Sequence, residues 1–227
     1  MSPTSKSKPI RILLVDDHAI VREGLAETLS REPQFKVCAE AADAIQALTL
    51  ADSTRPHLAI VDLTLKDSNG LDLIKDLHIR HPKLAVLVLS MHDESLYAER
   101  AIRAGARGFM NKAEATKNLL SAIRQVLAGE LYLSDAATRQ MAAKALGQSP
   151  ARKSPTDADL LSDRELQIFE LLGRGHSVRQ IGAELNLDPS TIETYRARLK
   201  EKLGVKDANE LLQRAIRWNN SQMGQGL

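Results

Sequence analysis

Short, mainly apolar runs recur along the first half of the chain, and each one ends at or just before a polar residue. They occupy residues 12–15, 58–61, 86–89 and 108–111. Runs of this length are typical of strands that are buried on both faces of a parallel sheet. A further strand is indicated by the apolar stretch around Cys38.

Helical spacing of apolar residues appears between these runs, near residues 21–29, 44–51, 71–77 and 123–127. Strand and helix therefore alternate about five times, which is the pattern of an α/β domain. We predict a doubly wound, five-stranded parallel sheet. In such a sheet all strands end at one edge, and ligands bind in the crevice outside that edge.

The polar residues at the ends of the predicted strands are Asp16, Asp17, Asp62, Ser90 and Lys112. The topology brings them together, and their chemistry is complementary. Three carboxylates suit a hard cation such as Mg²⁺, and a carboxylate such as Asp62 can also attack phosphorus. The lysine and the serine hydroxyl would stabilise the oxygens of a phosphoryl group.

A single Asp after a strand is commonly just the N-cap of the next helix. We interpret Asp43 and Asp93 in this way. His18 follows the Asp pair and is interpreted as an exposed loop residue, because Mg²⁺ prefers oxygen ligands. His92 lies two residues after Ser90, close enough to influence hydrolysis of a phosphoryl group.

Composition places limits on the rest. The 227 residues exceed one average domain, which predicts two. Only 3% of residues are aromatic, which argues against a platform for stacking single-stranded nucleic acid. Cys38 is the only cysteine, so no disulfide forms within the chain. No stretch reaches transmembrane length and residues 1–9 lack the core of a signal peptide, so we expect a cytoplasmic protein without membrane contact.

The second half of the chain has only helical patterns. A linker is predicted over residues 130–158, with a helix from Ser134 to Leu146 and a flexible break near 147–158. Short helices then begin at predicted caps, which are Ser162 with Glu165 as a capping box, Ser177, and Asp188 followed by Pro189. Two short helices joined by a tight turn predict a helix-turn-helix.

The helix that starts at Pro189 is amphipathic. One face is predicted to be core, with Ile192, Tyr195, Leu199 and Leu203 at helical spacing. Residues 196–206 carry five basic side chains against one acid, although the whole chain is only +2. Such a helix can contact DNA phosphates or can simply be a solvated surface; charge alone leaves both open.

The first half resembles the receiver domain of two-component response regulators, over residues 9–129, through the five strand-end residues described above. The resemblance implies that a histidine kinase phosphorylates Asp62. It also implies that Asp17, Asp62 and the backbone carbonyl of Thr64 bind Mg²⁺, with Asp16 helping through water. The family's catalytic and switch roles fall on Ser90, Lys112 and Phe109.

Residues 159–220 resemble the four-helix DNA-binding domain of the LuxR/NarL class, through motifs such as 161–165, 190–192 and 202–205. The implied contacts to bases and DNA backbone are Ser190, Thr191, Glu193, Thr194, Ala197, Arg198 and Lys200. The acid at 193 departs from the basic residue common there, and could accept from cytosine N4. The last helix is implied to dimerise, through Leu211, Leu212 and Ala215, or alternatively only to complete the domain.

The two resemblances together imply a NarL/FixJ-type response regulator. It would be a transcriptional regulator rather than an enzyme, bind promoter sites on double-stranded DNA, and form a homodimer when phosphorylated. RNA polymerase is a further candidate partner. A DNA-binding regulator that ignores phosphorylation, with a vestigial receiver, is the alternative. A dehalogenase-type phosphatase would need a second acid at Thr64, and an esterase would need a Gly-x-Ser-x-Gly motif that the chain lacks.

Overall fold

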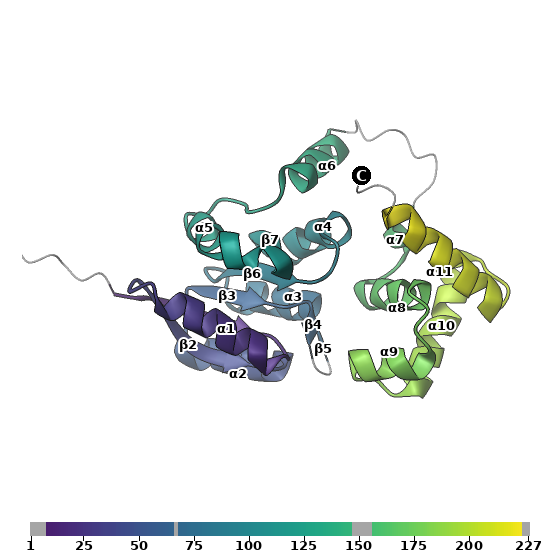
Figure 1. Cartoon of the computed structure of the whole chain (residues 1–227), viewed down its shortest axis with the longest axis horizontal. Helices are drawn as coiled ribbons and strands as arrows, with labels where there is room; N and C mark the ends of the chain where they lie inside the picture. The colour runs from purple at the N-terminus through teal and green to yellow at the C-terminus, as the bar shows by residue number, and fades with distance from the viewer. Residues whose placement is uncertain (1–7, 66–67, 147–155, 224–227) are drawn as a thin grey trace, which may run out of the picture. The chain divides into compact units, whose positions relative to one another are not determined.

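The computed structural model describes residues 8–65, 68–146 and 156–223 of the chain (Figure 1). It divides into two compact units, residues 1–147 and 148–227. The break predicted near residues 147–158 lies mostly outside the described residues.

The first unit is built on a five-stranded parallel sheet. The strands are β1 (Ile10–Val15), β2 (Phe35–Ala41), β3 (Leu58–Val61), β6 (Ala85–Ser90) and β7 (Gly108–Asn111). Their order is β2-β1-β3-β6-β7. The predicted doubly wound sheet is thus confirmed. All residues of β3 and β6 are buried, as their aliphatic sequences indicate.

Five helices cover the sheet. They are α1 (Ala19–Ser30), α2 (Ala44–Thr54), α3 (Gly70–Arg80), α4 (Glu94–Ala104) and α5 (Ala115–Leu127). Apolar residues of α1 and α5 share one core cluster with β1, β3 and β6, which places these two helices on the same face. Asp43 and Asp93 are N-caps, as predicted, and accept from the backbone N–H groups of Gln46 and Ser95.

A small antiparallel hairpin follows β3 and was not predicted. It pairs β4 (Thr64–Leu65) with β5 (Ser68–Asn69). Gly70 comes next, and its N–H donates to the Leu63 carbonyl at 2.9 Å. A Cβ at this position would lie 2.3 Å from the Asp62 carbonyl oxygen, so only glycine lets α3 start this close to the strand end.

The helix predicted after the receiver is α6 (Asp135–Ala145), capped by Ser134. It packs against α4. Three polar contacts join the pair: Ser134 N donates to Glu94 at 2.9 Å, Gln140 to the Ser95 carbonyl at 3.4 Å, and Lys144 pairs with Glu99 at 2.9 Å. The start of the predicted linker is therefore packed onto the first unit.

The second unit consists of helices. They are α7 (Asp157–Leu160), α8 (Asp163–Gly173), α9 (Val178–Leu185), α10 (Pro189–Leu203) and α11 (Ala208–Met223). The capping boxes of Ser162 and Ser177 are present. Asp188 is the N-cap of α10 with Pro189 in the first turn, but its side chain makes no capping hydrogen bond.

The turn between α9 and α10 depends on Gly182. Asn186 ends α9 in the left-handed conformation, with φ of 50°. The chain then folds back so tightly that the Leu187 N–H donates to the Gly182 carbonyl at 2.8 Å. A Cβ on Gly182 would lie 2.6 Å from the Leu187 carbonyl oxygen. This close approach produces the predicted helix-turn-helix.

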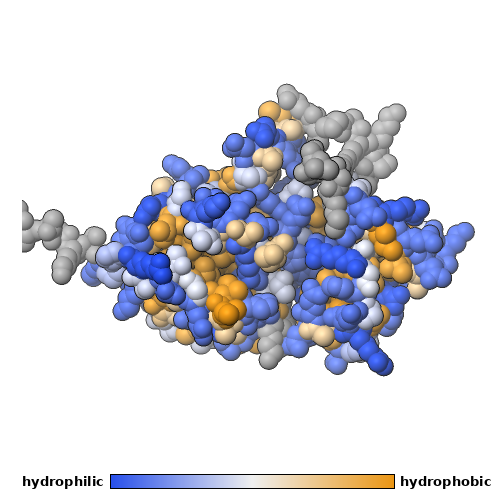
Figure 2. Space-filling view, in the orientation of Figure 1, coloured by the Kyte–Doolittle hydropathy of each residue, from blue (hydrophilic) through white to orange (hydrophobic). Residues whose placement is uncertain are grey.

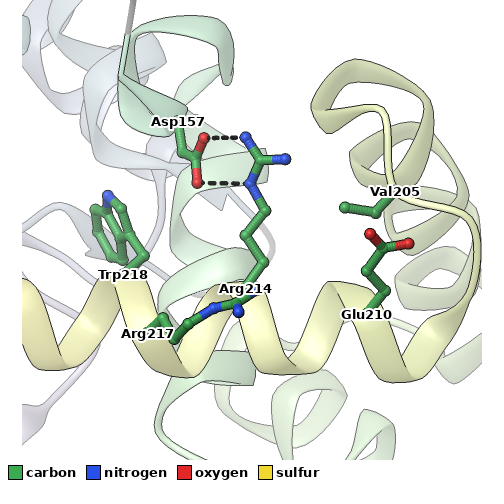
Figure 3. A pocket seen from close by; sticks show the side chains of 6 residues that line it. All are labelled: Asp157, Val205, Glu210, Arg214, Arg217 and Trp218. Atoms are coloured by element: carbon green, nitrogen blue, oxygen red, sulfur yellow. Dashed lines mark hydrogen bonds and ion pairs between the residues drawn. The ribbon is translucent and has the colours of Figure 1, made fainter.

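Helix α7 was not predicted, and it lies partly in the predicted linker. Thr156 and Asp159 form its capping box. Asp157 makes two hydrogen bonds, of 2.6 and 2.9 Å, to the guanidinium of Arg214 on α11 (Figure 3). They border a cavity of about 370 Å³ that is also lined by Val205 and Trp218. An ion pair thus ties α7 to the last helix, which runs to Met223 rather than to Trp218.

Hydrophilic side chains cover most of the face shown in Figure 2, and apolar ones gather in patches. Exposed large apolar residues of the first unit include Ile20, Ile45 and Met91. Within the described residues, no helix combines the length and apolar character needed to cross a membrane.

Candidate functional site

The three predicted carboxylates meet at the carboxyl edge of the sheet. Asp16 directly follows β1 and Asp62 directly follows the neighbouring β3. The Asp62 N–H donates to the Val15 carbonyl at 2.8 Å, which continues the strand pairing and fixes the position of its side chain. An oxygen of each of Asp16, Asp17 and Asp62 lies within 4.8 Å of the others.

Lys112 joins this cluster from the end of β7. Its Nζ lies 2.6 Å from Asp16 Oδ2 and 2.7 Å from Asp62 Oδ2. All three side chains are largely buried, at 13, 4 and 5% exposure for Lys112, Asp16 and Asp62. In such an environment charges interact strongly, and a lysine facing two carboxylates is held in one place.

Burial raises the pKa of Asp62, although the nearby charge and hydrogen bond of Lys112 act to lower it. For Lys112, burial alone would lower the pKa, but the charges and hydrogen bonds of Asp62 and Asp16 outweigh burial and the pKa is raised. The lysine therefore stays cationic, and an added positive charge in this pocket would favour the ionised form of Asp62.

Ser90 is the last residue of β6 and is fully buried beside Asp62. Its hydroxyl lies close enough to act on the pKa of Asp62, and its Oγ accepts from the His92 N–H at 3.3 Å. The His92 ring lies 3.1 Å from Thr64 Oγ1 and stacks on Tyr97 at 4.5 Å between centroids. His92 thus lies at the rim of the pocket, as its place in the sequence suggested.

The donor set fits Mg²⁺. It is rich in carboxylate oxygens, which hard cations prefer. Asp62 Oδ1 is buried and, among the described residues, receives no hydrogen bond of good geometry. A buried oxygen of this kind is normally paired, and a bound cation would pair it. His18 contacts Asp17 at 2.7 Å but is 61% exposed, as expected for a loop histidine.

The remaining residues named from the resemblance to receiver domains are Phe109 and Thr64. Phe109 is buried in β7, three residues before Lys112. Thr64 begins β4 and is partly buried. The structure therefore brings together Asp16, Asp17, Asp62, Ser90 and Lys112. The individual roles of these residues stay predictions.

The second candidate site is the outer face of α10. Ile192, Leu199 and Leu203 are buried and Tyr195 is partly buried, so the predicted core face is confirmed. On the other side, the predicted DNA contacts are exposed or partly exposed, namely Ser190, Thr191, Glu193, Thr194, Ala197, Arg198 and Lys200. Their side chains are accessible to a DNA duplex.

Several of these side chains have partners within the helix. The Thr194 hydroxyl donates to the Ser190 carbonyl at 3.1 Å. The guanidinium of Arg198 lies 5.7 Å from the centre of the Tyr195 ring. Sequence reasoning did not identify a contact of Glu193, whose Oε1 lies 2.7 Å from Arg196 Nη1. The i, i+3 spacing of the two residues on a helix is the signal that could have found it.

The residues predicted for dimerisation do not form one surface. Leu211 and Ala215 are 1 and 0% exposed, inside the core of the second unit. Of the three predicted residues only Leu212 has an exposed side chain, and Ile216 of the same helix is also exposed. The last helix therefore contributes its buried residues to the domain core, which does not decide between the two roles weighed for it. The side chains of Leu211 and Ala215 pack within the domain, and a dimer contact through the last helix stays a prediction.

Two family models match the chain. One, described as the response regulator receiver domain, matches residues 12–124. The other, described as bacterial regulatory proteins of the luxR family, matches residues 159–215.

Similar proteins cover nearly the whole chain. The transcriptional regulatory protein UhpA of Salmonella typhimurium is 38% identical over 206 residues, which are 90% of this chain and 97% of UhpA. The response regulator GacA of Pseudomonas aeruginosa is 34% identical over 208 residues, 92% of this chain and 96% of GacA.

Solved structures agree on the fold. A two-component response regulator of the LuxR family from Aurantimonas is 35% identical with a TM-score of 0.56, covering 61% of this chain and 99% of its own. RcsB of Salmonella enterica, bound to the promoter rprA with the phosphomimetic BeF₃⁻, is 24% identical with a TM-score of 0.59. That match covers 91% of this chain and 98% of the RcsB chain. At this identity the likeness supports the fold alone.

Proposed function

Because the chain belongs to the NarL/FixJ-type two-component response regulators, in which a receiver domain precedes a luxR-type DNA-binding domain, we propose that phosphorylation of Asp62 controls its binding to promoter DNA. The observation that carries this proposal is the buried group in which Lys112 contacts both Asp16 and Asp62. We place the receiver at residues 9–129 and the DNA-binding domain at 159–220, with a linker between.

Asp62 is the proposed phosphoryl acceptor. A P–O bond forms to one of its carboxylate oxygens while the P–N bond of a kinase phosphohistidine breaks, and the histidine ring leaves with the electron pair and takes a proton. Lys112 supplies a fixed charge and Ser90 a hydroxyl for the phosphoryl oxygens. Lys112 engages Asp62 Oδ2, whereas Oδ1 accepts no hydrogen bond of good geometry from the described residues.

Asp16, Asp17 and Asp62 are the side chains that would hold Mg²⁺, with the carbonyl of Thr64. The bound cation supplies positive charge for the oxygens of the incoming phosphoryl group. Phe109 and Ser90 are the residues through which phosphorylation would reshape the neighbouring helices.

The DNA-binding face is proposed to be the outer side of α10. Ser190, Thr191, Arg198 and Lys200 would contact the DNA backbone, while Glu193, Thr194 and Ala197 would face base edges. Promoter binding fits UhpA, which is named a transcriptional regulatory protein, and RcsB, which was solved on a promoter. Binding as a homodimer would place two such helices about one DNA turn apart.

The partners that follow are promoter DNA, a histidine kinase, a second copy of the chain, and RNA polymerase at the promoter. The protein is proposed to work in the cytoplasm and to act as a regulator rather than as an enzyme.

The first test is the intact mass of the chain after incubation with Mg²⁺ and a small acyl-phosphate donor. We expect the native chain to gain one phosphoryl group and Asp62→Asn to gain none. Asp76→Asn is a matched control, because Asp76 is an exposed aspartate on α3. No gain by the folded native chain would favour the alternative, a regulator with a vestigial receiver.

A further inference from the structure

An acidic side chain occupies the face of α10 that is proposed to enter the major groove. Glu193 is 57% exposed, so its carboxylate can reach a DNA duplex. The groove is lined by phosphates, which repel a carboxylate and make an uncompensated one unfavourable there. Arg196 Nη1 lies 2.7 Å from Glu193 Oε1 and provides the compensation.

Arg196 differs from an ordinary surface arginine. Its side chain is only 20% exposed, and its Nε is buried with no hydrogen-bond partner among the described residues. By contrast, the pair of Lys75 and Asp72, with the same i, i+3 spacing on α3, is 49 and 67% exposed. A half-buried arginine has few alternative conformations, so its guanidinium is a fixed donor for the carboxylate.

The ion pair of Glu193 and Arg196 leaves one carboxylate oxygen of Glu193 available to accept a hydrogen bond from DNA. Arg196 engages Oε1, so Oε2 is the oxygen that can accept from a base. In the major groove cytosine N4 and adenine N6 are amino donors, but adenine also presents the N7 acceptor beside its amino group, and guanine presents only acceptors, which repel a carboxylate. Thr194, the next residue, has its hydroxyl hydrogen bonded to the Ser190 carbonyl and offers mainly its methyl group.

We propose that Arg196 is a positioning residue for base specificity, which holds the Glu193 carboxylate so that it accepts a hydrogen bond from cytosine N4. The inference rests on the proposed function, since it names the base that the DNA-binding face prefers and the side chain that sets this preference. Arg196 itself contacts neither base nor phosphate.

The test is a selection from a random duplex DNA pool with the full-length chain, treated with acyl phosphate and Mg²⁺, followed by affinity measurements on the enriched sequence. Arg196→Met keeps most of the side-chain volume and removes the donor. Arg196→Lys is the conservative variant, and Arg198→Met is the matched control on the exposed side of the same helix. Thermal unfolding confirms that each variant is folded.

We expect the native chain to prefer cytosine at one position of each half-site, by about fivefold over other bases, the low end for a direct base contact. Glu193→Ala and Arg196→Met should lose this preference while preferences at other positions remain. Arg196→Lys should retain part of the cytosine preference, because lysine can still donate to the Glu193 carboxylate. Arg198→Met should weaken binding to all sequences alike and lower the salt dependence.

The outcomes separate the inference from the function on which it rests. If Arg196→Met weakens binding to all sequences equally and keeps the cytosine preference, Arg196 is a phosphate contact and the inference is overturned. If Arg196→Met does not fold, Arg196→Leu, which also lacks a donor, replaces it, with the same expected loss of preference. If the native chain enriches no sequence at all, the proposed function itself fails.

Discussion

Glu165 shows how one buried charge links the helices of the second unit. It is 3% exposed, its carboxylate accepts from the Ser162 backbone N–H at 2.8 Å, and Lys202 of α10 lies 2.7 Å from it. Burial alone would raise the pKa of Glu165, but the hydrogen bonds from Lys202 and Ser162 outweigh it and the pKa is lowered. The residue therefore closes the capping box of α8 and holds α10 at the same time.

The lowered pKa of Glu165 predicts the direction of a pH effect on stability. A carboxylate with a lower pKa in the folded than in the unfolded protein stabilises the fold above its unfolded pKa, about 4.3 for Glu. This stabilisation disappears as the pH falls through the folded value. We expect Glu165→Gln, which can still cap α8, to cost about 1 kcal/mol at neutral pH, because Lys202 is partly solvated.

Urea unfolding of the native chain and Glu165→Gln from pH 7 to pH 3 measures this effect. The difference in unfolding free energy should shrink as the pH falls. A difference that stays constant over this range would mean that packing, and not the charge of Glu165, causes the loss. Lys202→Met should show the same pH dependence, since it removes the other member of the pair.

At the scale of elements, we expect opposite effects on stability from substituting two helical glycines, Gly182 beside the α9–α10 turn and Gly24 in α1. Gly182→Ala would place a Cβ 2.6 Å from the Leu187 carbonyl oxygen, whereas nothing lies within 4 Å of a Cβ at Gly24 in α1. We expect Gly182→Ala to destabilise the second unit by about 2 kcal/mol or more and to weaken DNA binding. Gly24→Ala should stabilise the first unit by up to about 1 kcal/mol, through helix propensity.

Calorimetry of each variant, together with phosphorylation by acyl phosphate, checks both expectations. Phosphorylation should be unaffected by Gly182→Ala, because that glycine belongs to the other unit. An unchanged unfolding temperature for Gly182→Ala would show that the α9–α10 turn relaxes without cost.

The last helix carries a further prediction, because its apolar residues divide into two groups. Leu212 and Ile216 are 36 and 37% exposed, whereas Leu211 is 1% exposed. If α11 forms the proposed dimer contact, Leu212→Asp should weaken binding to a two-half-site operator about tenfold and leave folding intact. Leu211→Asp should unfold the unit, since it buries a charge.

Binding of Leu212→Asp to a single half-site is the control, and it should match the native chain. Sedimentation of the phosphorylated proteins gives the oligomeric state directly. A fully dimeric Leu212→Asp would place the dimer contact elsewhere in the chain.

The sequence predicted the elements best where one local signal decided them. The aliphatic runs of β3 and β6, the caps at Asp43 and Ser162, and the core face of α10 follow from periodicity and hydrogen-bonding capacity within a few residues. Because parallel strands share one carboxyl edge, the same patterns also predicted that Asp16, Asp62 and Lys112 would meet. That prediction depended on the topology of the sheet and not on how individual side chains pack.

The misses depended on contacts between distant residues. The capping box of α7 was readable from Thr156 and Asp159, but its ion pair with Arg214 crosses 57 positions. Leu211 and Leu212 are adjacent and equally apolar, so periodicity alone did not separate the buried from the exposed one. Packing of α6 against α4 likewise depends on side-chain geometry, which composition does not specify.

At the scale of the whole molecule, the two units predict coupling between phosphorylation and DNA binding. The proposed phosphorylation site, Asp62, lies in residues 1–147 and the proposed DNA-binding face in residues 148–227, so the proposed control has to connect two compact units. Phosphorylation can shift binding only as far as it stabilises the binding-competent state over the other. Couplings of this kind are typically about 5- to 150-fold in affinity.

Operator affinity of the native chain, measured before and after phosphorylation and compared with Asp62→Asn, tests this coupling. We expect phosphorylation to raise the affinity of the native chain within that range and to leave the variant unchanged. If dimerisation carries the effect, linkage requires that operator DNA strengthens dimerisation by the factor by which dimerisation raises operator affinity. Sedimentation with and without operator DNA measures that factor. If operator DNA leaves dimerisation of the phosphorylated chain unchanged, the coupling lies within one chain, whereas equal operator affinities before and after phosphorylation would favour the vestigial receiver.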